Sequence, residues 1–248
     1  HKMYAGLRDA WLYCGNEQAK ILFLQFCDWA VNITSHLSDE QMEQMLGNEH
    51  GGMNEVLADA YAITQEQKYL DCAKRFSHKR LLVPMSQRQD CLDNMHANTQ
   101  VPKVIGFERI SELSGNEDYH VASSFFWDIV TGERSLAFGG NSRREHFPAK
   151  DACMDFINDI DGPESCNTNN MLKLTEYLHR RNPEATTTYS LPSILNTEVM
   201  CISPLRVLAI IATTPPLTRL CGAALVPAWR IMASMGNSSI PMRAMPSL

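Results

Sequence analysis

The 248-residue sequence has no apolar run long enough to cross a bilayer, since stretches such as 207–212 fall far short of the roughly 20 residues required. It has no excess of basic residues either: 22 Lys and Arg stand against 28 Asp and Glu. Glycine and proline are too sparse for a collagen-like or low-complexity chain. These absences exclude strongly basic nucleic-acid binders and membrane-spanning proteins. We therefore expect neither nucleic acid nor a membrane among the partners.

Disulfide chemistry is also unsupported by the pattern of the eight cysteines. Most lie singly inside helical patterns of a long chain, which favours reduced thiols, and no two are adjacent. Four of them are expected to act as small buried apolar residues: Cys14, Cys27, Cys72 and Cys91.

Charge is distributed unevenly along the chain. Residues 185–248 contain a single acid, Glu198, and four arginines, whereas most of the charged residues precede them. The two segments have net charges of +3 and −9, and the later one also holds most of the prolines. A shift of this size within one domain is unusual, and it divides the sequence at residue 184.

Three segments spaced fifty residues apart share one pattern. Residues 7–17, 57–67 and 107–117 each place apolar residues at helical spacing and end in a turn at 15, 65 or 115. A second amphipathic run follows each turn, at 19–29, 69–76 and 119–130. Helix pairs repeated at this period must bury their apolar faces on one another, so we predict an all-α fold. The period alone fits equally a protein-binding helical solenoid and a closed α/α barrel.

The segments between the repeats favour the barrel. They are polar and contain histidine, and loops at the same phase of each repeat would gather at one end of a barrel, where scaffolds carry function. Five stretches in order carry a resemblance to a known family: residues 1–10, 51–59, 96–106, 139–147 and 164–173.

Those stretches resemble glycoside hydrolase family 127 and its β-L-arabinofuranosidase-like relatives. The resemblance implies an incomplete α/α barrel of the six-hairpin glycosidase kind over residues 1–184. The family pattern does not begin at His1, so we expect an N-terminal part of the domain, with any signal peptide, to be missing; this leaves the cellular location open.

The family chemistry implied by this resemblance is retaining hydrolysis of a furanoside. A zinc-bound cysteine thiolate is the nucleophile, and a glutamic acid is the general acid/base, a departure from the usual pair of carboxylates. By position, Glu145 corresponds to the acid/base, while Glu164 and Cys166 correspond to two zinc ligands. Without the resemblance, Glu164 and Cys166 would be a weak metal signal, and Glu145 beside two arginines would more often form a surface salt bridge.

An arabinose-containing carbohydrate is the expected substrate. Sugar hydroxyls need closely spaced donors and acceptors, and helix capping or loop structure is the alternative role for each candidate. The candidate sugar contacts are His96, Asn98, Asn54, Glu55, Asn141 and His146.

The family pattern ends near residue 185, before the Cys-Cys pair that holds the family's nucleophile. Codons for residues 220–226 can be chosen so that a frame shifted by two bases encodes Met-Trp-Cys-Cys-Val-Gly, the family's nucleophile motif. The same shift fits family-like sequence at 200–204 and 226–235. We therefore predict that residues 185–248 are an out-of-frame, poorly packed tail, against the alternative of a divergent C-terminal segment.

The chain is thus expected to be an inactive fragment of a β-L-arabinofuranosidase-like hydrolase that binds zinc weakly. Two other functions stay open: a metal-free α/α-barrel epimerase or uronide hydrolase, and a helical-repeat interaction module.

Overall fold

The computed structural model describes residues 1–136, 139–150, 152, 159 and 161–182. The chain divides into two compact units, 1–202 and 203–248, and every described residue lies in the first. The boundary expected at residue 184 and the tail after it lie outside the described residues.

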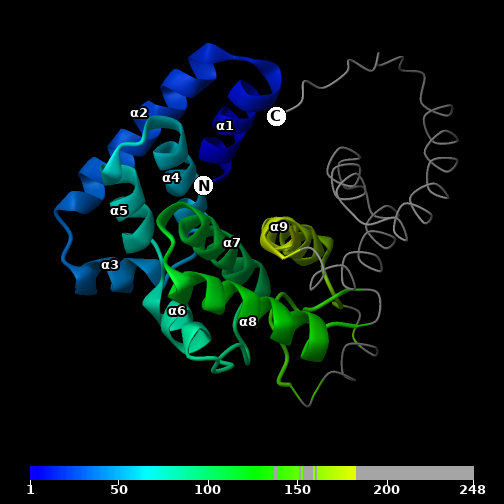
Figure 1. Cartoon of the computed structure of the whole chain (residues 1–248). Helices are drawn as coiled ribbons and strands as arrows, with labels where there is room; N and C mark the ends of the chain where they lie inside the picture. Colours follow the sequence, from blue (N-terminus) through cyan, green and yellow to red (C-terminus); the bar gives the residue numbers. More distant parts are fainter. Residues whose placement is uncertain (137–138, 151, 153–158, 160, 183–248) are drawn as a thin grey trace, which may run out of the picture. The chain divides into compact units, whose positions relative to one another are not determined.

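The described residues form α-helices joined by turns and loops, which confirms the all-α prediction (Figure 1). No helix among these residues is both long enough and apolar enough to cross a membrane. The helices are α1 (Lys2–Cys14), α2 (Glu17–Ser35), α3 (Asp39–Leu46), α4 (Met53–Thr64), α5 (Gln67–Arg75), α6 (Lys79–Ser86), α7 (Ala97–Ser114), α8 (Glu117–Glu133) and α9 (Ser165–Arg181).

The fifty-residue repeat is a helical hairpin, formed three times by α1–α2, α4–α5 and α7–α8. The first helix of each hairpin ends at Gly15, Gln65 or Gly115, with φ values of 66°, 61° and 68°. This left-handed backbone suits glycine, which has no Cβ to clash. Asn16 and Asn116 then cap the second helices by accepting backbone N–H bonds. The three predicted turns are confirmed.

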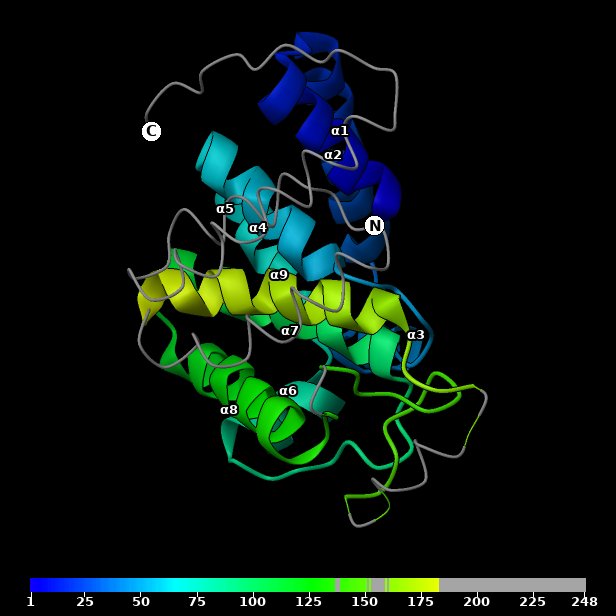
Figure 2. The same cartoon turned by 90° about the vertical axis from the view of Figure 1, so that its right-hand side faces the viewer.

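From α4 onward, the first helices of successive units pack side by side. Helix α4 packs on α7, and α7 packs on α9, which begins a fourth unit (Figure 2). Helix α7 is buried along most of its length because α4, α8 and α9 all pack against it. This arrangement is the one expected of an incomplete α/α barrel.

The hairpins share one hydrophobic core, to which α2, α4, α7, α8 and α9 contribute. The cysteine prediction is correct for Cys27 and Cys72, which are buried, whereas Cys91 is only half-buried. It is wrong for Cys14, which is exposed in the last turn of α1. All four, together with Cys166, are free thiols.

Candidate active site

The segment that carries Glu145 is tied to the start of α7 by backbone hydrogen bonds. The Phe147 N–H donates to the Met95 carbonyl at 2.9 Å, and the Ala97 N–H donates to the Glu145 carbonyl at 2.8 Å. The Asn94 N–H completes the ladder by donating to the Phe147 carbonyl at 3.0 Å. Two motifs fifty residues apart in the sequence are thereby joined side by side.

Glu145 is presented by a strained backbone. Both Arg144 and Glu145 have positive φ values, 49° and 67°, which non-glycine residues adopt only when their surroundings impose them. The Glu145 carboxylate is exposed, and its Oε2 lies 3.6 Å from His96 Nε2. An exposed carboxylate on a backbone held by hydrogen bonds to the start of α7 is positioned to meet a ligand from solvent.

His96 has two roles, one for each ring nitrogen. Its Nδ1 accepts the Thr99 N–H at 3.2 Å and so caps α7. Since Nδ1 is the acceptor, Nε2 carries the proton in the neutral ring and faces Glu145. The His146 ring packs edge-on to His96 with centroids 5.2 Å apart. Two predicted sugar contacts and the predicted acid/base therefore form one cluster.

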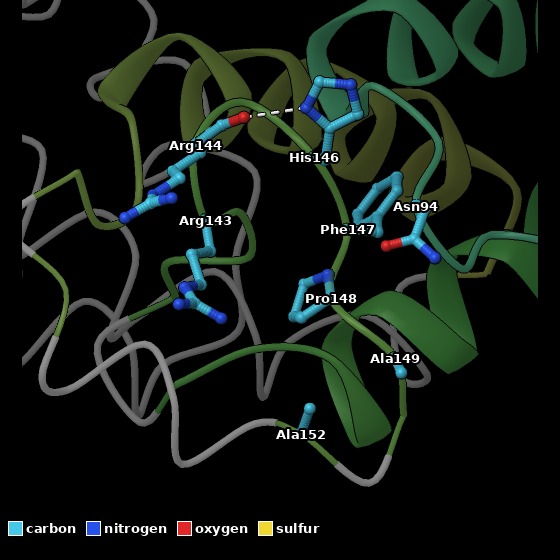
Figure 3. A pocket seen from close by; sticks show the side chains of 8 residues that line it. All are labelled: Asn94, Arg143, Arg144, His146, Phe147, Pro148, Ala149 and Ala152. Carbon is cyan, nitrogen blue, oxygen red and sulfur yellow. Dashed lines mark hydrogen bonds between the residues drawn. The ribbon is translucent and has the colours of Figure 1, made fainter.

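A cavity of about 380 Å³ opens beside this cluster. Figure 3 shows His146 above it, held by the hydrogen bond between its Nδ1 and the Arg144 carbonyl at 2.7 Å. The Nε atoms of Arg143 and Arg144 both contact the Asp159 carboxylate, at 2.7 and 3.1 Å. The lining residues are Asn94, Arg143, Arg144, His146, Phe147, Pro148, Ala149 and Ala152.

Ser142 connects the Glu145 segment to the start of α9. Its hydroxyl accepts the Asn167 side-chain N–H at 2.6 Å and the Glu164 backbone N–H at 3.4 Å. Glu164 is the N-cap residue of α9, and Cys166 lies in its first turn. The Cys166 thiol donates to the Glu164 carboxylate, with 2.9 Å between Sγ and Oε2. The two predicted zinc ligands are therefore adjacent in space.

Glu164 and Cys166 alone do not complete a zinc site. No cluster of three or more His, Cys, Asp or Glu side chains suited to a metal occurs in the part of the chain that the structure describes. A protein zinc site takes three or four such ligands. Burial and the neighbouring Glu164 carboxylate also raise the pKa of the Cys166 thiol to about 11, so the pair without metal holds a proton.

Asn54 and Glu55 are placed deeper than a surface sugar contact. Asn54 is fully buried, donates to the Lys103 carbonyl at 2.8 Å and lies against Gly106 of α7. Glu55 is also buried and forms ion pairs with Arg8 and Lys173. Burial alone would raise the pKa of Glu55, but the two cations outweigh it and hold the pKa below its ordinary value. The contacts of both residues bind α1, α4, α7 and α9 together.

Asn98 and Asn141 differ in how their amides are used. The Asn98 side-chain oxygen accepts from the Asn170 amide of α9 at 2.7 Å. Asn141 is fully buried, and neither its amide nitrogen nor its oxygen has a hydrogen-bond partner among the residues that the structure describes. The Asn167 oxygen is likewise buried without one. A buried amide without partners costs free energy, and this cost is typical of positions that await a ligand or water.

Three residues of this region were not singled out from the sequence: Ser142, Lys173 and Arg8. Each lies inside a motif quoted above, and each is polar at a position that packs against another helix. For Arg8 and Lys173, which lie on helices, the available signal was a charged residue among apolar ones; Ser142 lies in a loop and gave no such signal. That signal identifies burial of a polar group but does not identify its partner.

The comparison with protein families concerns the chain as a whole. A helical-hairpin fold that brings carboxylates, histidines and amides to one end of neighbouring helices is suited to polyhydroxylated ligands. The family model described as beta-L-arabinofuranosidase, GH127 catalytic domain, matches residues 1–193. The chain therefore belongs to this family of glycoside hydrolases. No curated protein matches the sequence.

Proposed function

We propose that the chain is a piece of a retaining hydrolase of β-L-arabinofuranosides whose general acid/base is Glu145. The observation that carries the proposal is the position of the Glu145 carboxylate. It is exposed, held by a backbone with positive φ, and faces the protonated nitrogen of His96. In the intact enzyme, Glu145 would protonate the leaving oxygen and later remove a proton from the attacking water.

The neighbouring residues would bind and orient the sugar. The His96 and His146 rings, which lie beside Glu145, offer ring N–H groups and nitrogen acceptors to hydroxyls. The unpaired Asn141 amide offers a donor and an acceptor from the same loop. The contacts already made by Asn54 support a different task for it, which is to fix the helices beneath the site. Glu55 uses its Oε1 in ion pairs with Arg8 and Lys173, but its buried Oε2 has no hydrogen-bond partner among the described residues, so that oxygen stays a candidate sugar contact.

The proposal includes a zinc ion, of which two ligands lie among the described residues. Glu164 and Cys166 would supply two donors, and the bound metal would keep a coordinating thiolate deprotonated near neutral pH. The chain as printed offers only this pair among its described residues. We therefore propose that it binds zinc weakly and does not turn over substrate, because the cysteine pair of the family is hidden by a shifted reading frame after residue 184.

The nucleotide sequence tests the frame shift directly. The codons for residues 220–226 should contain TGG TGC TGC, or synonymous codons, when read two bases later. If they do not, the idea of an out-of-frame tail fails.

The activity is tested on the frame-corrected protein. We expect it to hydrolyse a β-L-arabinofuranoside with retention of the anomeric configuration. NMR of the reaction mixture measures the configuration of the sugar that is first released. Substituting Glu145→Gln should lower the rate about 10²- to 10⁴-fold, the usual contribution of a general acid/base. Glu66→Gln, at an exposed ion pair in the α4–α5 turn, is the matched control and should leave the rate unchanged. Inversion, or a rate insensitive to chelators, would instead favour a metal-free α/α-barrel enzyme.

A further inference from the structure

Arg134, directly after α8, is a buried guanidinium that joins separate segments of the chain. Only 2% of the residue is exposed, which leaves almost none of it open to a ligand from solvent. Its Nε and Nη2 donate to Asp90 Oδ2 at 3.1 and 2.7 Å, and Nη2 also donates to Asp93 Oδ1 at 2.6 Å. Its Nη1 donates to the Pro148 carbonyl at 2.7 Å. One side chain thus holds both the loop before α7 and the segment that follows Glu145.

These partners lie at one end of the backbone ladder in the candidate site. Asp93 immediately precedes Asn94, whose N–H donates across the ladder to the Phe147 carbonyl at 3.0 Å. Pro148 immediately follows Phe147 on the other side of the ladder. Arg134 therefore ties the two sides together at the point where they leave the ladder.

The ladder is too short to hold its turn alone. Three backbone hydrogen bonds join its two sides in the described part of the chain, and a two-stranded pairing of that length is marginally stable. It must nevertheless hold Arg144 and Glu145 at positive φ, which costs free energy at each residue. Asn94, on the opposite side, also has a positive φ, of 60°. Contacts outside the ladder must therefore keep this backbone in place.

Two contacts with the α8 region supply this support, and they differ in what they fix. Phe147 is fully buried and packs edge-on to Phe126 of α8, with ring centroids 6.1 Å apart. Apolar burial is non-directional and does not by itself fix the direction of the backbone. The planar guanidinium of Arg134 instead directs four hydrogen bonds, in a rigid fork, to acceptors on both sides of the ladder. Arg134 is therefore the contact that sets the direction of the Glu145 segment.

We propose that Arg134 is a positioning residue for Glu145, an inference that deepens the proposed function and rests on it. By holding both sides of the ladder, it keeps the Glu145 carboxylate beside His96, where Oε2 and Nε2 are 3.6 Å apart. Lysine cannot replace it, because a single ammonium group does not reproduce the geometry of a planar fork. Arg134→Lys should therefore loosen the Glu145 turn while it keeps the positive charge.

NMR of the histidine rings in the full 248-residue chain tests the position of Glu145. Glu145→Gln should shift the His96 Nε2 signal, because it removes the facing carboxylate. Arg134→Lys should shift the same signal in the same direction, and it should add little to the shift in the double variant with Glu145→Gln. Arg75→Lys is the matched control, since Arg75 of α5 also donates to two backbone carbonyls, around the end of α2. It should leave the His96 signal unchanged.

Two results of this experiment overturn the proposal. One is a folded Arg134→Lys chain, verified by circular dichroism, whose His96 signal does not move. The other is a full additional shift in the double variant, because Arg134 would then act on His96 without Glu145. If Arg134→Lys does not fold, Asp93→Ala takes its place, since it removes one of the four bonds at a side chain that is 55% exposed. It should shift the His96 signal in the same direction by a smaller amount, and an unmoved signal again overturns the proposal.

Kinetics of the frame-corrected protein are the second arm. Arg134→Lys should lower kcat about 10- to 10²-fold, because a displaced acid/base is felt in the transition state. KM should stay within about twofold, because Arg134 does not touch the sugar. A raised KM with an unchanged kcat overturns the proposal. A frame-corrected protein without activity would defeat the proposed function, whereas the His96 signal would still decide whether Arg134 positions Glu145.

Discussion

Gly106 shows at the scale of one residue how closely α4 and α7 pack. A Cβ added at this glycine would lie 2.2–2.3 Å from three side-chain atoms of Asn54, which is itself fully buried. No rearrangement of a flexible chain end can relieve this overlap, because the Asn54 amide is fixed by the Lys103 carbonyl.

Gly106→Ala should therefore lower the free energy of unfolding by about 2 kcal/mol or more, as expected for overpacking. Gly132→Ala is the matched control in another helix, where nothing lies within 4 Å of the added Cβ. It should be neutral or stabilise by about 0.5–1 kcal/mol, because alanine favours the helix. Urea unfolding measures both, and equal effects of the two substitutions would contradict the close packing of α4 on α7.

Lys103 is a buried amine whose charge the fold disfavours. Its Nζ lies 3.1 Å from His78 Nδ1 and 3.1 Å from Gln100 Oε1. Burial, followed by repulsion from Arg80, lowers its pKa to about 8.

Between this pKa and the ordinary value of 10.5, the unfolded chain binds more protons at this lysine than the folded chain does. The contribution of Lys103 to stability therefore rises with pH through that window. Relative to Lys103→Met, the unmodified chain should gain free energy of unfolding as the pH rises from 8 to 10. The gain should be on the order of 1 kcal/mol per pH unit at most. Urea unfolding at several pH values measures this, and Lys79→Met, at an exposed amine, is the control. Parallel pH profiles for the unmodified chain and Lys103→Met would contradict the lowered pKa.

At the scale of the element, the three hairpins repeat one turn with two different residues. Gly15 and Gly115 adopt the left-handed conformation without strain, whereas Gln65 adopts it with a Cβ present. The second hairpin thus has the least favourable residue at an equivalent position.

Gln65→Gly should raise the free energy of unfolding by several tenths of a kcal/mol, and Gly15→Ala should lower it by about 1 kcal/mol. The gain is smaller than the loss because glycine also increases the entropy of the unfolded chain. Thermal melts of the two variants measure these opposite effects. A destabilised Gln65→Gly chain would show that the glutamine makes contacts that outweigh its strained backbone.

The hairpins were predictable from the sequence because they depend on local signals. Apolar spacing, glycine at 15 and 115, and asparagine at the N-caps all act within one turn of the residues they affect. The short helices α3 and α6 were not predicted. Each spans only eight residues, and α6 contains Pro84, so local propensity is weak and packing against the hairpins decides.

The candidate site was predictable only in part, because its geometry depends on contacts between distant segments. The positive φ of Glu145 is imposed by bonds to the start of α7, and the ion pairs of Glu55 come from α1 and α9. Motif resemblance located Glu145, Glu164 and Cys166. It could not distinguish a sugar contact from a residue such as Asn54 that holds two helices together.

At the scale of the whole molecule, the first unit carries the family's helices and the proposed acid/base, while the proposed zinc site has two described ligands. This predicts a difference in metal content between two chains. The 248-residue chain should lose zinc on dialysis, whereas the frame-corrected chain should keep a stoichiometric amount, measured by mass spectrometry of the metal. Cys166→Ser should abolish that retention, and Cys14→Ser, at an exposed thiol, should not. Stoichiometric zinc on the 248-residue chain would contradict an incomplete site.

The central claim is that this chain holds the acid/base half of a β-L-arabinofuranosidase site without the nucleophile. The most direct measurement is the release of arabinose from a β-L-arabinofuranoside by the purified 248-residue chain in the presence of zinc. We predict no release above the uncatalysed rate, although the frame-corrected chain hydrolyses the same substrate. Turnover by the 248-residue chain that Glu145→Gln abolishes would contradict the claim, because the nucleophile would then have to lie within the sequence as printed.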